Sequence, residues 1–397
     1  MISKKMVGLV KGSSVIRAMF EEGKKMAQMY GAENVFDFSL GNPNVPAPQA
    51  VSDNIVKIVK EENSVVLHGY MSNVGFEDVR DAIAKSLNKR FDLNLEAKNI
   101  VMTVGAAGGL NVIFKTLLDP NDEVITFAPF FGEYKNYVSN FDANLVVVNP
   151  NPPTFEPDYV DFEKKITERT KAVLVNNPNN PTGIIYKKEW IEKIASILEK
   201  KQKEYGTSIY LISDEPYREL VYGGEEVPYL TKYYRNTIVG YSYSKSLSLP
   251  GERIGYLVIP TQIDDYEDVF AAAGVATRIL GFVNAPSLQQ KLIKECLDEK
   301  TNIEAYNKNR IRLYEGLQEC GFECVKPEGA FYLFMKAPIE DDSEFVKVAK
   351  EYNLLLVPAS SFGVKGYVRI AYCVSYDTIE RSMTAFRKLA QRYGLIK

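Results

Sequence analysis

The feature that most constrains this chain is a series of short apolar segments, rich in β-branched residues, that alternate with helical patterns. Because they are mostly apolar throughout, they are typical of strands buried on both faces. Seven segments of five or six residues have this character: 99–104, 123–127, 144–148, 172–176, 208–213, 237–241 and 254–259. The alternation predicts an α/β fold with a mostly parallel, seven-stranded sheet flanked by helices. Functional side chains are then expected just after the strands.

The two ends of the chain have a different pattern. Long helices are predicted at 13–30, 295–317 and 378–393, and short strands at 331–335, 354–357 and 367–371. Ser13 or Ser14 is the expected N-cap of the first helix, and Gly394 is expected to close the last. We therefore expect a large domain at 46–289 and a smaller α+β domain formed by 1–45 together with 290–397.

Charge and rare residue types exclude several classes of protein. The 397 residues include 48 Lys+Arg and 51 Asp+Glu, a net charge of −3, so we expect neither a nucleic acid nor an anionic membrane as partner. No apolar run approaches the ~18 residues of a membrane-spanning helix. The single histidine, His68, excludes a His-rich zinc site.

The cysteines and the first ten residues bear on location. No metal is expected, because the cysteines have no second pair or histidine partner with metal-ligand spacing. Reduced, apolar cysteines in a reducing compartment are the expected alternative. The apolar part of residues 1–10 is too short for a secretory signal, and we expect a cytoplasmic protein.

Polar motifs directly follow three of the predicted strands. The loop 177–183, Asn-Pro-Asn-Asn-Pro-Thr-Gly, places asparagine amides at a strand end, and its prolines make it rigid. Another strand leads to Asp214, whose carboxylate is costly to bury unless a donor or a cation meets it. A third leads to a serine-rich segment with Lys245, eight residues before Arg253. Hydroxyls with an arginine suit a phosphate, and a lysine beside them suits a Schiff base.

A fourth motif joins the strand at 99–104 to a helix that begins with small residues from Gly105 onwards. Exposed N–H groups and the helix dipole make such an end an anion site. Each motif alone also fits an ordinary turn, helix cap or solvated lysine. Together they indicate an aldehyde cofactor with a phosphate, a protonated ring nitrogen and a phenolic oxygen, and pyridoxal phosphate fits this description.

With these motifs the chain resembles the fold-type I pyridoxal-phosphate enzymes, specifically the class I aminotransferases related to aspartate aminotransferase. The resemblance extends from the Ser-Leu-Gly-Asn-Pro segment at 39–43 to the strand at 367–370, and the 177–183 loop and the Lys245-to-Arg253 spacing are its most specific matches. It implies transfer of the amino group of an L-α-amino acid to a 2-oxo acid through two half reactions. Aspartate or a broad set of substrates is implied.

The resemblance also implies a role for each matched residue. Lys245 carries the cofactor as a Schiff base and then moves the proton at the substrate Cα. Asp214 pairs with the ring nitrogen, Tyr217 and Asn180 bond to the phenolic oxygen, and Phe131 stacks on the ring. The remaining cofactor-binding residues are Gly105, Ala106, Ala107, Ser242, Ser244 and Arg253, of which the two alanine N–H groups, Ser242 and Arg253 contact the phosphate.

Further matches concern the substrate and the second subunit. Arg369 matches the arginine that binds the substrate α-carboxylate, where Gly41 and Asn180 also contribute. Tyr70 matches a tyrosine that reaches the cofactor phosphate of the other subunit, which implies a homodimer with shared sites. By family analogy, Ile16 and Phe20 are expected to cover the substrate side chain.

The chain also departs from the family pattern. Ala107 stands where the family often has threonine, serine or a longer polar side chain. No arginine matches the one that binds a distal carboxylate in the best-known aspartate enzymes.

Two alternatives use much of the same pattern. A β-eliminating C–S lyase of the same fold would also use Lys245, Asp214 and Arg253, because residues outside the motifs decide the fate of the carbanion. A cofactor-sensing transcription regulator would need an N-terminal DNA-binding domain. We do not expect one, because the family pattern begins within the first forty residues and no basic stripe is present.

Overall fold

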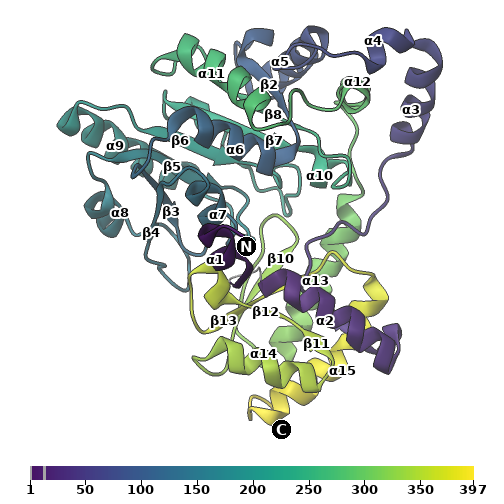
Figure 1. Ribbon diagram of the computed structural model, residues 1–397. Helices are drawn as coiled ribbons and strands as arrows, with labels where there is room; N and C mark the ends of the chain where they lie inside the picture. Colours follow the sequence, from purple (N-terminus) through teal and green to yellow (C-terminus); the bar gives the residue numbers. More distant parts are fainter. Residues whose placement is uncertain (1, 12–14) are drawn as a thin grey trace.

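The computed structural model describes residues 2–11 and 15–397. Its larger part is built on a seven-stranded sheet (Figure 1). In spatial order the strands are β2 (Ile100–Thr103), β8 (Gly255–Val258), β7 (Thr237–Ser242), β6 (Tyr210–Asp214), β5 (Thr170–Asn176), β3 (Glu123–Phe127) and β4 (Asn144–Val148). β3 to β7 run parallel, and β8 is antiparallel to both of its neighbours. The predicted mostly parallel sheet is confirmed.

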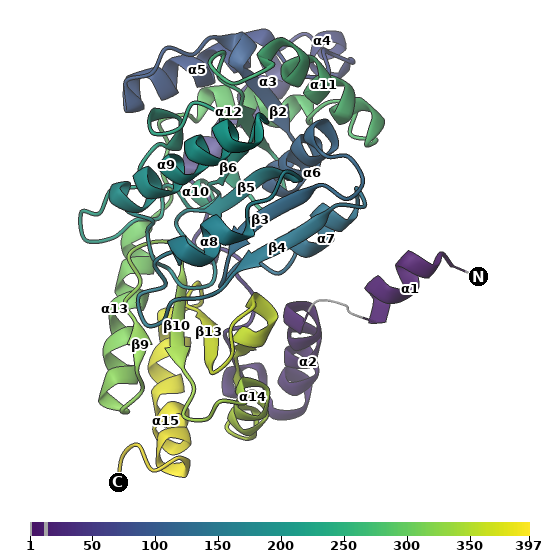
Figure 2. The same cartoon turned by 90° about the vertical axis from the view of Figure 1, so that its left-hand side faces the viewer.

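Helices cover this sheet and bury its apolar side chains. Figure 2 shows α6 (Gly105–Leu117) and α7 (Tyr134–Ser139) on one side of β3 to β5, and α8 (Tyr159–Lys165) and α9 (Lys188–Tyr205) on the other. In β8, Leu257 packs in one apolar cluster, whereas Tyr256 and Val258 pack in another, because successive strand side chains point to opposite faces. The helices of this part are α3 (Gln49–Glu61), α4 (Ser64–His68), α5 (Glu77–Phe91), α6 (Gly105–Leu117), α7 (Tyr134–Ser139), α8 (Tyr159–Lys165), α9 (Lys188–Tyr205), α10 (Tyr243–Ser246), α11 (Tyr266–Ile279) and α12 (Ser287–Glu295).

The C-terminal region forms a second, antiparallel sheet below the first one in Figure 1. Its strands, in spatial order, are β12 (Val357–Pro358), β13 (Tyr367–Ala371), β10 (Tyr332–Lys336) and β9 (Cys324–Val325), and β1 (Phe36–Asp37) pairs separately with β11 (Leu354–Leu355). The helices here are α2 (Val15–Tyr30), α13 (Ile303–Glu319), α14 (Asp342–Glu351) and α15 (Tyr376–Arg392), whereas α1 (Lys4–Lys11) lies apart from them in Figure 2 and its Lys5 contacts Ser139 and Asp142 of the larger part. Phe334, Val357 and Phe362 join an apolar cluster of the large sheet, so the two sheets pack on a shared core.

Two sequence predictions about these elements are wrong. The helix predicted at 295–317 is broken, because α12 ends at Glu295 and the side chain of Asn302 caps α13 by accepting a hydrogen bond from the Ala305 N–H. The strand predicted at 354–357 is two strands, because β11 pairs with β1 while β12 pairs with β13. Gly394 follows α15 with φ +70°, as predicted for a helix-closing glycine.

Several expectations concern residues 13–20 or features of the whole chain. The caps at Ser13 and Ser14 and the side chains of Ile16 and Phe20 lie outside the described residues. Within the described residues, no helix combines the length and apolar character that crossing a bilayer requires. The same residues contain no group of His, Cys, Asp and Glu that could hold a metal ion.

Candidate active site

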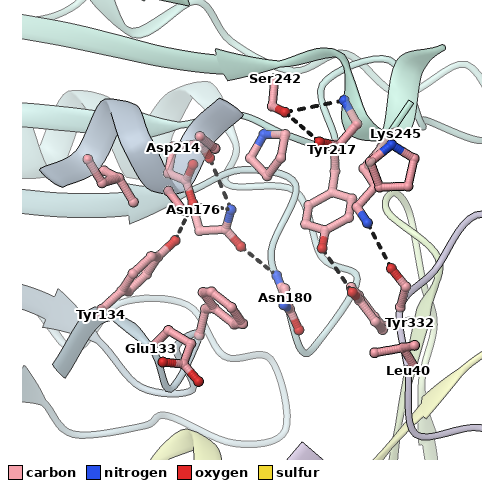
Figure 3. A pocket seen from close by; sticks show the side chains of 18 of the residues that line it. Leu40, Glu133, Tyr134, Asn176, Asn180, Asp214, Tyr217, Ser242, Lys245 and Tyr332 are labelled. Atoms are coloured by element: carbon pink, nitrogen blue, oxygen red, sulfur yellow. Dashed lines mark hydrogen bonds between the residues drawn. The ribbon is translucent and has the colours of Figure 1, made fainter. Parts of the chain in front are cut away.

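A cavity of about 700 Å³ lies where β5, β6 and β7 end, facing β10 and β13 of the C-terminal sheet (Figure 3). The structure brings most of the predicted site residues together here: Gly41, Ala106, Ala107, Phe131, Asn180, Asp214, Tyr217, Ser242, Ser244, Lys245, Arg253 and Arg369 all line it. Gly105 lies beside the cavity at the start of α6. Tyr70 is 93% exposed and lies outside the cavity of this single chain.

Lys245 lies on the short helix α10, which follows β7 directly. The helix begins at Ser242, whose hydroxyl accepts a hydrogen bond from the Ser244 N–H at 3.2 Å. Lys245 Nζ donates to the Gly41 carbonyl at 2.7 Å. Burial lowers the pKa of Lys245 to about 8. About half of this amine is therefore neutral near pH 8, and the neutral form is the one that acts as a nucleophile or a base.

Asp214 is the last residue of β6, and its carboxylate is held on one side only. Tyr134 donates to Oδ2 at 2.5 Å, and Asn176 Nδ2 lies 3.4 Å from the same oxygen and donates to the Asp214 backbone carbonyl at 3.0 Å (Figure 3). Burial raises the pKa of Asp214 to about 7, and the hydrogen bond from Tyr134 opposes this rise. Oδ1 is buried and has no hydrogen-bond partner among the described residues.

The unbonded Oδ1 of Asp214 shows which kind of ligand the cavity can accept. A buried acceptor without a donor is costly, so Oδ1 calls for a ligand that donates a hydrogen bond. A protonated pyridine nitrogen is such a donor. The residues present therefore fit the ring of the cofactor, with Asp214 at its nitrogen.

The other end of the cavity fits a phosphate. Gly105 begins α6 with φ +76°, and a Cβ there would lie 2.7 Å from Arg253 Nη2, so only glycine lets the arginine approach this helix end. Ala106 and Ala107 lie in the first turn of α6 and line the cavity, as do Ser242, Ser244 and Arg253. Helix N–H groups together with an arginine are a suitable set of donors for a phosphate.

Arg369 provides a buried cation on the opposite wall of the cavity. It lies within β13, is 1% exposed, and donates to Asn180 Oδ1 at 3.1 Å and to the Ser39 carbonyl at 2.5 Å. The rings of Tyr332 and Phe362 lie 4.5 and 5.0 Å from its Cζ atom. Its Nε has no partner among the residues described. The planar guanidinium is thus fixed in one plane, which suits two-point binding of a carboxylate.

Sequence reasoning missed four residues that hold the predicted ones. Tyr134 and Asn176 bond to Asp214, Tyr332 bonds to Tyr217 through their hydroxyls at 2.8 Å, and Ser39 bonds to Arg369. Asn176 is the last residue of its strand, immediately before the asparagine loop, so the strand-end rule could have found it. The other three meet their partners across long sequence separations, and no local pattern indicates them.

A family model and curated relatives match most of the chain. The family model for aminotransferases of class I and II matches residues 33–386. An aspartate aminotransferase of Thermotoga maritima is 28% identical over 372 residues, covering 93% of this chain and 95% of the relative. A probable N-acetyl-LL-diaminopimelate aminotransferase of Bacillus subtilis is 30% identical and covers 88% of both chains.

Solved structures are similar over nearly the whole chain. A crystal structure of an aminotransferase from Eubacterium rectale is 48% identical, with a TM-score of 0.97 over 99% of this chain and 100% of the other. Aspartate aminotransferase of Thermus thermophilus with maleate is 27% identical, with a TM-score of 0.86 over 98% and 99% of the two chains. These names do not favour the C–S lyase alternative. The chain belongs to the class I and II aminotransferase family and is a pyridoxal-phosphate-dependent aminotransferase.

Proposed function

We propose that this enzyme moves the amino group of an L-α-amino acid to a 2-oxo acid in two half reactions at the cavity between the two sheets. The observation that carries the proposal is the joint placement of three groups in one cavity: the part-buried Lys245 amine, the buried Asp214 carboxylate with one oxygen unbonded, and the buried Arg369 guanidinium. A base, an anion and a cation so placed can bind an amino acid and remove the proton from its Cα.

The cofactor end of the cavity has a defined set of ligands in this proposal. Lys245 attaches the cofactor, Asp214 pairs with the ring nitrogen, and Asn180 and Tyr217 bond to the phenolic oxygen. Phe131 covers the ring, and a set of donors holds the phosphate: the backbone of Gly105, Ala106 and Ala107, with Ser242, Ser244 and Arg253. When bound, pyridoxal phosphate supplies an aldehyde that condenses with amines and a cationic ring that accepts an electron pair.

The chain's own residues then orient the substrate and move its proton. Arg369 binds the α-carboxylate, with Asn180 and the Gly41 backbone beside it, which fixes the Cα near Lys245. The Lys245 amine, once released from the cofactor and neutral, would take the proton from the substrate Cα and hold it for return, a transfer that typically contributes ~10²–10⁴ in rate. Asp214, as an anion, would keep the ring nitrogen of a bound cofactor protonated.

For the substrate side chain we propose only a class of amino acids. Aspartate and a broad set of amino acids are both compatible with relatives that carry aspartate, prephenate, aromatic and N-acetyl-diaminopimelate names.

We also propose a cytoplasmic homodimer with a large domain at 46–289 and a small domain of 1–45 with 290–397. Tyr70, 93% exposed in one chain, would reach the cofactor phosphate of the partner. Exposed valines on α3 and α4 near it, with Val65 83% exposed, supply an apolar surface that a second copy would cover. The cysteines described are all free thiols, which fits a reducing compartment.

A half-reaction experiment tests the proposal. The holoenzyme is mixed with single L-amino acids in the absence of any 2-oxo acid, and its absorbance is followed. We expect one equivalent of 2-oxo product per site, loss of the lysine-bound cofactor band, and return of that band when a 2-oxo acid is added. Release of ammonia and a thiol from a sulfur amino acid, with no half reaction, would contradict amino transfer.

A further inference from the structure

The hydrogen bond between Tyr134 and Asp214 joins two buried residues in the wall of the cavity. Tyr134 is 1% exposed and Asp214 4% exposed, and the tyrosine hydroxyl lies 2.5 Å from Oδ2. The two residues are 80 positions apart and come from α7 and β6. The strand itself is paired on both sides by β5 and β7, so its course does not depend on this bond.

The bond makes the two carboxylate oxygens unequal. Oδ2 has the Tyr134 hydroxyl and, at 3.4 Å, the Asn176 amide, whereas Oδ1 has no partner among the described residues. The χ2 angle of an aspartate has a broad distribution, so a carboxylate without hydrogen bonds can rotate about its Cβ–Cγ bond. A short bond to one oxygen therefore selects the plane of the group and leaves the other oxygen available.

Tyr134 is itself held firmly enough to act in this way. Its ring meets the Phe131 ring edge-on, with centroids 5.6 Å apart and an interplanar angle of 87°. Its backbone N–H donates to the Phe131 carbonyl at 3.0 Å. Phe131 lines the same cavity as Asp214. Tyr134 therefore contacts both the Phe131 ring and the Asp214 carboxylate.

We propose that Tyr134 is a positioning residue of the reaction, whose hydroxyl holds the Asp214 carboxylate in one orientation, as an anion, with Oδ1 free for the ring nitrogen of pyridoxal phosphate. The inference rests on the role proposed above for Asp214. Tyr134 makes no contact with the substrate in this account and acts only through Asp214.

The groups around Asp214 also support a role for Tyr134 in keeping this carboxylate charged. Burial, helped to a smaller extent by the nearby Glu215 carboxylate, raises the pKa of Asp214 to about 7, whereas the hydrogen bond from Tyr134 lowers it. Tyr137 and Tyr217 are the other titratable groups whose pKa values respond to its charge. Loss of the Tyr134 hydroxyl would therefore leave a smaller fraction of Asp214 charged at neutral pH.

The test compares Tyr134→Phe, Asp214→Asn and the double variant in the full-length protein. Two quantities are measured: the dissociation constant of pyridoxal phosphate, by spectral titration of the cofactor-free enzyme, and kcat across pH 6–9. We expect Tyr134→Phe to weaken cofactor binding and to lower kcat by about 10- to 100-fold, the range for a lost hydrogen bond to a charged group. The loss in kcat should shrink as pH rises, because Asp214 then ionises.

A matched control separates this role from general stability. Tyr234→Phe also removes a buried tyrosine hydroxyl, which donates to the Ile209 carbonyl at 2.7 Å and lies outside the cavity. It should retain cofactor affinity and kcat. In the Asp214→Asn background, adding Tyr134→Phe should change either quantity by no more than about twofold, because residues that act through one another are not additive.

Each remaining outcome decides a different question. Wild-type cofactor affinity and pH profile in Tyr134→Phe, with Asp214→Asn inactive, would overturn the role of Tyr134 alone. Equal losses in both backgrounds would also overturn it, because the effect would not pass through Asp214. A fully active Asp214→Asn would instead contradict the proposed function. If Tyr134→Phe does not fold, 3,5-difluorotyrosine at position 134 should shift the kcat profile to lower pH, and an unchanged profile would overturn the proposal.

Discussion

The two walls of the cavity each bury a charge, but they hold it in different ways. On the large-sheet wall, Asp214 is bonded at one oxygen and open at the other. On the C-terminal wall, Arg369 donates to Asn180 and Ser39 and lies near the rings of Tyr332 and Phe362. The first wall therefore leaves one carboxylate oxygen for a ligand, whereas the second fixes the plane of a guanidinium that can bind a carboxylate at two points.

The walls also differ in how the chain builds them. Lys245 and Asp214 follow neighbouring strands of one sheet, so the sheet alone brings them together. Arg369 reaches the cavity only because the C-terminal sheet packs on the large one and residues near 39–41 lie between them. We therefore expect changes on the first wall to affect the cofactor and the chemistry, and changes on the second to affect the substrate.

The largest effect is expected for Lys245→Ala. Because the buried amine both attaches the cofactor and moves the Cα proton, kcat should fall by roughly 10⁴-fold or more, and the lysine-bound absorbance band should be absent. Steady-state kinetics and spectra measure both. Lys188→Ala, at an exposed lysine on α9, is the control and should behave like the wild type. Retained turnover in Lys245→Ala would contradict the claim that the large-sheet wall carries the cofactor and the chemistry.

A second prediction concerns pH and the stability of the cofactor-free protein. Burial raises the pKa of Asp214 from its ordinary value of 3.8 to about 7, so the folded state holds a proton that the unfolded state has lost over this range. Wild-type unfolding free energy should therefore fall relative to Asp214→Asn as pH rises from about 4 to about 7, by a few kcal/mol at about 1.36 kcal/mol per pK unit. Denaturant unfolding at several pH values measures it. If the unfolding free energies of the two proteins depended on pH in the same way, the pKa of Asp214 would not be raised by burial, which would contradict the prediction.

Arg369→Lys tests the substrate wall. A lysine keeps the charge but loses the planar, two-point geometry, so KM for the amino acid should rise by about 10- to 100-fold. The dissociation constant of the cofactor should stay within about twofold, because separate walls contribute nearly independent terms. Titration of the cofactor-free variant measures this second quantity. Equal loss of cofactor affinity and substrate affinity would mean that the walls do not act separately.

The smallest effect is expected for Tyr332→Phe. Its hydroxyl bonds to that of Tyr217, so its removal loosens Tyr217 while the ring on Arg369 remains. We expect kcat to fall by about fivefold, near 1 kcal/mol for one neutral hydrogen bond. Tyr222→Phe, which loses a buried hydroxyl bonded to the Ala330 carbonyl, is the control. A larger change in KM than in kcat would assign Tyr332 to substrate binding instead.

The same contrast explains what could be predicted from the sequence. Strand-end motifs in a parallel sheet identify residues such as Asp214 and Lys245, because each motif is local and the sheet aligns the strand ends. Tyr134, Tyr332 and Ser39 escape such reasoning, because their contacts depend on packing between segments far apart in the chain. The prediction of one helix at 295–317 was wrong for a related reason. Its apolar periodicity did not indicate that Asn302 caps a new helix, α13.

The most direct test of the central claim locates the cofactor on the chain. Reduction of the holoenzyme with borohydride fixes the cofactor to the lysine that carries it, and mass spectrometry of the tryptic peptides then identifies that lysine. Because a modified lysine resists trypsin, the account predicts one labelled peptide spanning residues 236–253, with the added mass on Lys245. A label on any other lysine, or no label in an active holoenzyme, would contradict the account.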